Sequence, residues 1–253
     1  IGRPGRAGKR SVQAGGPGPG EFLTGWSKNH LDRSVRYTYL DCMVQNFYAE
    51  PASGRPTGFF MPRTKEFDPD EALDLALDMF WRRGYEGTSM RDLLEGMDIS
   101  RQSLYDTFGD KRSLFIKVLG RYEALMMEGL VQHLQGLATV EAIRGYCEYF
   151  MSEVVHVPAH GSCLMANTAI EVGPTDAEIQ GIVRTYFGRV ESILHGVLAG
   201  ARAGGQIRED SDVRALARHV LNALHGLGIM GRSGASRPML RQMLNVALSV
   251  LER

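Results

Sequence analysis

The 253-residue chain contains only three cysteines, Cys42, Cys147 and Cys163. Three cysteines cannot build a disulfide framework, so we expect a protein of the reducing cytoplasm that folds without cross-links. No apolar run approaches the ~18 residues needed to cross a bilayer, and the first twenty residues contain no apolar segment of the kind found in secretory signals. The sequence therefore predicts a cytoplasmic protein without a membrane anchor.

The chain also lacks an excess of either charge. Its 29 Lys and Arg residues balance 29 Asp and Glu residues, which gives a formal net charge of zero. Binding to nucleic acid would therefore depend on locally placed basic residues, because no global basic field exists. A Gly-rich phosphate loop, a nucleophile elbow and a metal-spaced histidine pair are missing as well. We therefore predict no enzyme activity, no metal and no cofactor.

No segment has a convincing strand pattern. From Met61 onward, apolar residues recur at helical spacing, which predicts an all-α fold of nine helices. Residues 1–60 differ, because the first twenty are rich in Gly, Pro and Arg and the rest carry scattered aromatics without a period. Such a composition cannot bury enough apolar surface to fold. We expect residues 1–60 to be a disordered extension, or sequence upstream of a natural start at Met61.

Residues 88–111 predict two short helices joined by a tight turn. Ser89 followed three residues later by Asp92 is a capping-box start, and Gly96 is placed where helices commonly end. Ser100 is a second N-cap candidate. Helix, glycine-containing turn and helix is the signature of the helix-turn-helix, in which the second helix enters a DNA groove.

The second helix of this motif has one apolar and one polar face. Leu104 and Phe108 lie four residues apart and are expected to point inward together. An arginine can fork onto guanine and a glutamine onto adenine, while serine pairs with either base. Polar helix faces are more often merely solvated, but here two caps and a turn accompany the polar face. The predicted DNA contacts in this stretch are Thr88, Ser89, Ser100, Arg101, Gln102, Ser103, Tyr105, Thr107 and Lys111.

A longer set of residues falls in one order: Phe80, Gly84-Tyr85-Glu86-Gly87-Thr88-Ser89, Ile99-Ser100, Ser103-Leu104-Tyr105, Phe108 and Asp110-Lys111. This set closely resembles the DNA-binding domain of the TetR family of transcriptional regulators, over roughly residues 64–120. The resemblance implies a three-helix DNA-binding domain at 61–121 and a C-terminal helical domain at 122–253 that binds a small effector and forms a dimer. It also implies a short basic arm on the duplex backbone, formed by Arg63 and Lys65.

Two positions depart from the family pattern. The family usually has His or Tyr where this chain has Thr107, so a shorter side chain stands at one position that contacts phosphate in the family. Asp106 brings a negative charge close to the duplex. We expect Asp106 to pair with Arg101 or to accept a hydrogen bond from a cytosine amine.

The C-terminal half offers aromatic, methionine and polar side chains of the kinds that line small-molecule pockets. The alternative is plain core packing, which is the commoner role of methionines and aromatics at helical spacing. Glu171 is a further polar candidate. The predicted effector-binding residues are Tyr146, Phe150, Met151, Met165, Asn167, Thr168, Tyr186, Phe187 and His195.

Two other sites are considered and disfavoured. His156, His160 and Cys163 are all potential zinc ligands, but Pro158 separates the histidines, and zinc motifs need tighter spacing. An ordinary loop is the preferred interpretation. A redox role for Cys147 or Cys163 is disfavoured because the sequence nearby is not clearly electropositive.

The last two predicted helices are apolar enough to need a cover. A four-helix interface across a two-fold axis would supply one, and reading a palindromic operator requires such a pair. The alternative is burial within the monomer against the long helix that follows Thr175. The predicted dimer-interface residues are Leu216, Val220, Leu224, Leu227, Met243, Val246 and Val250.

The sequence thus favours a ligand-responsive regulator, a repressor that binds a palindromic double-stranded operator as a homodimer and is released by a small-molecule effector. An all-α enzyme with an incidental helix-turn-helix is one alternative. A nonspecific architectural DNA binder is another, but residues 61–121 hold ten Lys and Arg against twelve Asp and Glu, without the basic face it would need.

Overall fold

The computed structural model describes residues 67–152, 160 and 162–252. Within these ranges the regular structure consists of nine α-helices and one short 3-10 helix, and no strand occurs there. The described residues belong to one compact unit, Arg63–Arg253. The predicted all-α fold and the number of helices are confirmed for this part of the chain. Arg63, Lys65, His156 and residues 1–60 lie outside the described residues.

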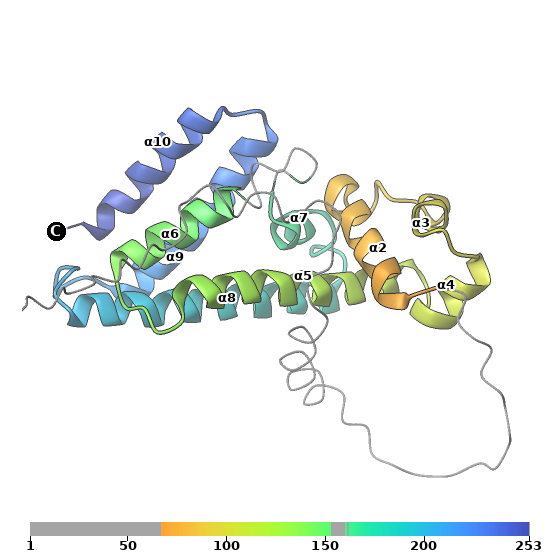
Figure 1. Cartoon of the computed structure of the whole chain (residues 1–253), viewed down its shortest axis with the longest axis horizontal. Coiled ribbons are helices and arrows are strands. Elements are labelled where there is room, and N and C mark those ends of the chain that lie inside the picture. Colours follow the sequence, from red (N-terminus) through yellow and green to blue (C-terminus); the bar gives the residue numbers. More distant parts are fainter. Residues whose placement is uncertain (1–66, 153–159, 161, 253) are drawn as a thin grey trace, which may run out of the picture. The chain divides into compact units, whose positions relative to one another are not determined.

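Three short helices form the N-terminal end of the described chain (Figure 1). They are α2 (Pro69–Arg83), α3 (Met90–Met97) and α4 (Arg101–Phe108). The start of α2 is set by Asp68, whose side chain accepts a hydrogen bond from the Asp70 amide at 2.9 Å, and by Pro69 at the first helical position. The helix ends at Gly84, whose positive φ of 78° suits glycine.

A long helix, α5 (Lys111–Leu134), connects these three helices to the rest of the chain, and α8 (Ala177–Ala203) runs beside it (Figure 1). The other helices of this half are α6 (Val140–Phe150), α7 (Leu164–Glu171), α9 (Val213–Arg232) and α10 (Arg237–Leu248), followed by the 3-10 helix η3 (Ser249–Leu251).

One hydrophobic core extends from the three short helices into the C-terminal half. Phe80 of α2 packs against Phe115 of α5, with 4.9 Å between ring centroids. Farther along the same helices, Trp81 meets Tyr122 edge-on at 5.0 Å. Aromatic pairs at these distances add to the stability gained by burial alone. The short helices are therefore packed onto α5, rather than being tethered to it by a loop.

Two predicted helix ends are wrong. Gly96 lies inside α3, and Asp98 instead caps the helix in the left-handed conformation, with φ of 51°. A Cβ at Gly96 would clash with the sulfur of Met79, so this glycine permits close packing of α3 on α2. Thr175 followed three residues later by Glu178 also predicts a capping box, but Asp176 caps α8 instead by accepting from the Glu178 and Ile179 amides.

Candidate nucleic-acid interface and effector site

The turn between α3 and α4 is held by side-chain caps on both helices. Ser89 and Asp92 form the predicted capping box at the start of α3. Ser100 Oγ accepts a hydrogen bond from the Ser103 amide at 3.0 Å and so caps α4. Between them Asp98 closes α3, and the helix-turn-helix geometry predicted from the sequence is confirmed.

The two faces of α4 divide as predicted. Leu104 and Phe108 are buried, with 0% and 5% of their surface exposed. The opposite face is open to solvent, and Tyr105 on it is 45% exposed although it is aromatic. Ser103 and Thr107 are partly buried at the edges of this face. The exposed polar residues of α4 are Arg101, Gln102, Tyr105 and Asp106.

Asp106 is engaged by a residue that the sequence did not indicate. Gln102 Nε2 donates a hydrogen bond to Asp106 Oδ1 at 2.7 Å, one helical turn away. The expected pairing of Asp106 with Arg101 is wrong in this structure, where no hydrogen bond or ion pair of Arg101 is found among the described residues. One N–H of the Gln102 amide is therefore engaged by a residue of its own helix.

Of the residues predicted to contact phosphate, Tyr105 and Thr107 lie within α4 and Lys111 lies at the start of the next helix. Lys111 is the first residue of α5, and its ammonium group stands 4.2 Å from the centroid of the Tyr85 ring. A cation held over an aromatic face keeps a defined position while its outer side remains hydrated. Ser89 is exposed as well, with its hydroxyl engaged by Asp92.

Thr88 is not placed to contact DNA through its side chain. It is fully buried, and its hydroxyl donates to the Gly84 carbonyl at 2.7 Å. This hydrogen bond closes the loop between α2 and α3, so Thr88 serves the fold. The prediction of a Thr88 side-chain contact is therefore corrected.

The predicted effector residues are mostly buried in the C-terminal half. Tyr146, Phe150, Met151, Met165, Thr168 and Tyr186 are each at most 5% exposed, whereas Asn167, Phe187 and His195 are partly exposed. Thr168 donates to the Leu164 carbonyl of its own helix, and Asn167 accepts from Ser162. These two polar groups are therefore already paired within the protein.

Some of these side chains meet around a residue that sequence reasoning missed. Tyr122 of α5 is fully buried, its ring lies 6.1 Å from that of Tyr186, and its hydroxyl has no hydrogen-bond partner. Burial raises the pKa of Tyr122, Tyr146, Tyr186 and Cys163, and each of the three phenols is close enough to the Cys163 thiol for their charges to interact. The sequence does not indicate this position of Tyr122, because its spacing fits the apolar stripe of its helix.

Glu171 is not part of this interior. Its carboxylate accepts hydrogen bonds from the backbone amides of Tyr85 and Glu86, at 3.0 and 2.8 Å. The last residue of α7 thereby holds the loop that follows α2. The prediction of Glu171 as a polar group of the effector pocket is corrected to a contact with the DNA-binding helices.

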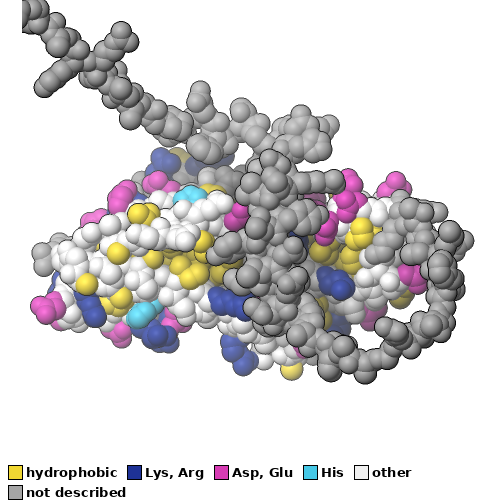
Figure 2. Space-filling view, turned by 60° about the horizontal axis from the view of Figure 1, so that its bottom comes forward, with side chains coloured by type: hydrophobic (Ala, Val, Ile, Leu, Met, Phe, Trp, Pro, Cys, Tyr) yellow, Lys and Arg dark blue, Asp and Glu magenta, His cyan; other side chains and the backbone are white. Residues whose placement is uncertain are grey.

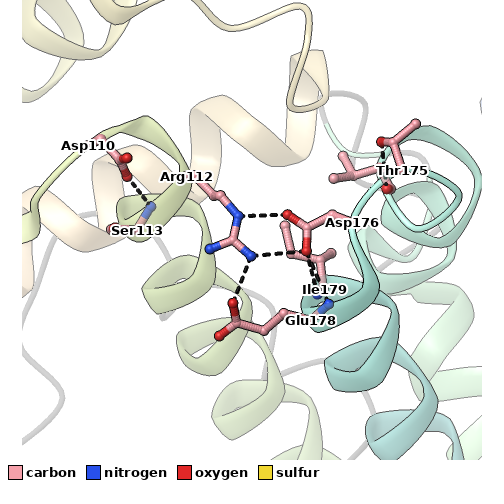
Figure 3. Close-up of polar contacts among 8 residues, drawn as sticks. Asp110, Arg112, Ser113, Thr175, Asp176, Glu178 and Ile179 are labelled. Carbon is pink, nitrogen blue, oxygen red and sulfur yellow. Dashed lines mark hydrogen bonds and ion pairs between the residues drawn. The ribbon is translucent and has the colours of Figure 1, made fainter.

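A second polar contact lies nearby (Figure 3). The Arg112 guanidinium, near the start of α5, donates to both oxygens of Asp176 at 2.6 and 3.0 Å and to Glu178 at 2.7 Å. Hydrogen bonding to Arg112 is the main reason that the pKa of Asp176 falls to about 2. The fork geometry fixes the start of α8 against the first turn of α5.

The loop before α7 also meets α2. Trp81 Nε1 donates to the Ser162 carbonyl at 2.6 Å, and the His160 ring stacks on Trp81 at 4.0 Å. His160 Nε2 also contacts Asp78 at 2.9 Å. Thus two of the three residues weighed as metal ligands have other environments, since Cys163 lies buried beside Tyr122.

The predicted dimer residues fall into three groups. Val220, Leu224 and Leu227 are at most 2% exposed in the single chain, so they pack within the monomer core and their assignment to the interface is corrected. Leu216 and Met243 are partly buried. Val246 and Val250 are exposed, at 72% and 49%. Ile229 and Met239, which the sequence analysis did not select, are 54% and 44% exposed.

The described surface has no dominant charge. Figure 2 shows basic and acidic side chains interspersed on the face in view, with hydrophobic side chains between them. Any basic field felt by DNA is therefore local, as the zero net charge predicts. None of the helices in the described ranges is both long and apolar enough to cross a membrane.

Two family descriptions match separate parts of the chain. Residues 72–118 match bacterial regulatory proteins of the tetR family, and residues 139–246 match the tetracyclin repressor-like C-terminal domain. The first range covers the short helices and the start of α5, and the second covers α6 to most of α10.

Curated relatives and solved structures agree with these matches. The chain is 34% identical over 194 residues to the uncharacterized HTH-type transcriptional regulator YezE of Bacillus subtilis, covering 76% of this chain and 100% of that one. It is 31% identical over 188 residues to the HTH-type transcriptional repressor ComR of Escherichia coli, with 74% and 90% covered. A structure of the TetR family regulator CifR, a cysteine mutant complexed with 26bp double-strand operator DNA, is 27% identical with a TM-score of 0.67, covering 74% of this chain and 98% of that one.

Proposed function

Because this chain belongs to the tetR family of bacterial regulatory proteins and is a DNA-binding transcriptional regulator, we propose that it represses transcription as a homodimer bound to a palindromic operator. A small effector bound in the C-terminal half releases it. The observation that carries the proposal is the exposed polar face of α4, held in a fixed orientation by capped helices and a buried apolar face. The family assignment and the repressor names of relatives such as ComR support the same direction.

The proposed DNA contacts of α4 and of the neighbouring helix starts divide into base contacts and phosphate contacts. Arg101 and Gln102 lie in the first turn of the helix, which is the part of a recognition helix that reaches base edges. Tyr105 and Lys111 bind phosphate oxygens, as do Ser89 and Ser100 at the helix starts. Phosphate contacts set the position of the helix, and base contacts give the sequence preference.

The dimer is proposed to form through exposed apolar side chains of α9 and α10. Met239 and Val246 project from α10, Val250 projects from η3 directly after it, and Ile229 projects from α9. Exposed apolar side chains on neighbouring helices need a cover, and a second copy supplies one with two-fold symmetry. That symmetry places two α4 helices to read two half-sites ~34–36 Å apart.

Effector release is proposed to act through α7 and the start of α8. Glu171 holds the loop after α2, and Arg112 holds Asp176 and Glu178 (Figure 3). A ligand that shifts α7 would move these contacts and with them the DNA-binding helices. A modest rotation is enough to spoil the half-site spacing. In this proposal residues 61–121 are the DNA-binding domain and residues 122–253 the effector-binding and dimerisation domain, with α5 running across the boundary.

The proposal is tested by fluorescence anisotropy with a labelled duplex that carries the palindrome beside the protein's own gene. Saturation by two protomers per duplex, with a clear preference over a scrambled duplex of equal length, supports it. An architectural DNA binder would bind both duplexes equally, and an enzyme with an incidental helix-turn-helix would bind neither at physiological salt.

A further inference from the structure

The interior of the C-terminal half contains an unpaired donor. Tyr122 Oη is buried and is the only such side-chain atom, among the described residues, without a hydrogen-bond partner. Buried polar groups in native proteins are nearly always paired, because an unpaired one loses its hydration without compensation. A fully buried phenol without a hydrogen-bond partner, beside only the weakly accepting Cys163 thiol, is therefore suited to a stronger acceptor supplied by a ligand.

The surroundings of Tyr122 carry no charge. Tyr146, Tyr186 and the Cys163 thiol share its neighbourhood, and burial raises the pKa of each, so all are neutral near pH 7. Farther along α8, the Phe187 ring lies 4.7 Å from His225, whose burial lowers its pKa to about 4.

Charged side chains are absent from the buried set. The buried polar residues in the described ranges are Thr88, Ser162 and Thr168, none of them ionisable. Glu123 is the carboxylate that acts on Tyr186, and it is held by Arg189 at 2.6 Å. Nothing in this interior would neutralise a charge brought in by a ligand, and an unpaired buried charge is strongly disfavoured.

We propose that the effector is an uncharged, largely apolar molecule with an oxygen acceptor, such as a ketone or aldehyde carbonyl, that takes the hydrogen bond of Tyr122. This inference rests on the proposed function, which places an effector in the C-terminal half, and adds the chemistry of the effector. Anionic and cationic ligands are excluded by the uncharged surroundings, and a pure hydrocarbon would leave the phenol unpaired.

Tyr122 also lies next to the DNA-binding helices. Its ring meets Trp81 of α2 edge-on, with an interplanar angle of 90°. Trp81 in turn donates to the Ser162 carbonyl, just before α7. A ligand that engages Tyr122 is therefore one aromatic contact away from α2, and Trp81 can report its binding.

The test uses the full chain with Trp26 replaced by Phe. The sequence has two tryptophans, so Trp26→Phe leaves Trp81 alone, and 5-fluorotryptophan then gives a single ¹⁹F resonance. Four probes of similar size are titrated: acetophenone, ethylbenzene, benzoate and benzylamine. We expect acetophenone to shift the Trp81 resonance and to bind roughly five- to tenfold more tightly than ethylbenzene, the gain of one hydrogen bond. Benzoate and benzylamine should bind more weakly still.

A variant isolates the hydroxyl. Tyr122→Phe removes only an unpaired polar atom, so it should fold with an unchanged or higher melting temperature. It should bind acetophenone and ethylbenzene equally. The matched control is Tyr149→Phe, whose ring stacks on His133 at 4.2 Å, and it should keep the preference for acetophenone.

The outcomes separate the two proposals. The inference is overturned if acetophenone fails to bind up to its solubility limit, if either charged probe binds as tightly, or if Tyr122→Phe keeps the preference for acetophenone. Operator titrations of the same proteins judge the function independently. If the protein binds the operator but does not prefer acetophenone, only the proposed effector chemistry is refuted. If it prefers acetophenone but does not bind the operator, only the proposed regulatory function is refuted.

Discussion

Gln102 donates a hydrogen bond to the Asp106 carboxylate one turn later in α4, with 2.7 Å between nitrogen and oxygen. An exposed base-reading candidate is thus held by an acid on the same face. The second N–H and the oxygen of the Gln102 amide can still pair with a base while this bond persists. We therefore expect Asp106 to orient the glutamine and, through its charge, to lower affinity for DNA in general.

Two substitutions at Asp106 separate its charge from its hydrogen bond. Asp106→Asn keeps an acceptor for Gln102 and removes the charge, so operator and scrambled DNA should both bind more tightly, by up to about 1 kcal/mol. Asp106→Ala should show the same gain and also relax base preference, because Gln102 is released.

Gln102→Ala should cost ~1–3 kcal/mol at one base pair of each half-site. Anisotropy titrations against single-base operator variants measure all three, and an unchanged preference in Gln102→Ala would remove this residue from the base-reading set.

Lys111 is expected to act on the backbone alone. Lys111→Ala should weaken binding to every sequence about equally and reduce the salt slope by ~1 per half-site, since one phosphate contact is lost. Lys117→Ala, a change at an exposed lysine on the same helix, is the control and should leave the slope intact. If Lys111→Ala changed base preference without changing the slope, α4 would dock differently from what is proposed here.

The dimer prediction concerns those predicted interface residues that are exposed in the single chain. Val246→Arg places a charge in the proposed seam and should yield monomers that fold but no longer hold the operator, at a cost of several kcal/mol to the dimer. Ile170→Arg is the control, because Ile170 is equally exposed, at 71%, but lies on α7. Leu224→Ala should instead lower the stability of the monomer by roughly 2–5 kcal/mol, because Leu224 is buried. Light scattering of Val246→Arg that still gives a dimer would place the interface elsewhere.

We expect Glu171 to affect the coupling between effector binding and DNA release more than the affinity for DNA itself. Glu171→Gln replaces one acceptor oxygen with a donor, so the carboxamide can no longer accept well from both the Tyr85 and Glu86 amides. Operator affinity without ligand should stay within threefold of the parent, about 0.7 kcal/mol, while the loss of DNA binding caused by acetophenone should shrink. Glu95→Gln is the control, because the partner of Glu95 is Arg91 on its own helix. An unchanged response to acetophenone in Glu171→Gln would show that the signal travels by another route.

Local signals predicted much of this fold. Asp68, Pro69 and Gly84 marked α2 because caps and helix breakers act within a few residues of their own position. Gly96 was misread as a helix end, because its reason for being glycine is the Met79 side chain of another helix. Asp98 took the left-handed position, which Asp tolerates better than most residues do.

Contacts between residues far apart in the sequence could not be predicted, because the signals used act only over a few neighbouring residues. The contact between Glu171 and the Tyr85 amide joins residues 86 positions apart, and no local pattern encodes it. Periodicity shows that a helix face is apolar but not which surface covers it. Leu224 and Val246 therefore looked alike in the sequence, although one is buried in the monomer and the other is 72% exposed. Tyr122 fitted an apolar stripe, and only the structure shows that its hydroxyl is unpaired.

The central claim is that two copies of α4 read one palindrome. The most direct measurement is an anisotropy titration of the full chain against three duplexes of equal length: the palindrome, the palindrome with one half-site scrambled, and a fully scrambled control. Two protomers should bind the palindrome, loss of one half-site should weaken binding at least about a hundredfold, and the full scramble should retain only salt-sensitive binding. Equal affinity for all three duplexes, or a stoichiometry of one protomer on the palindrome, would contradict the account.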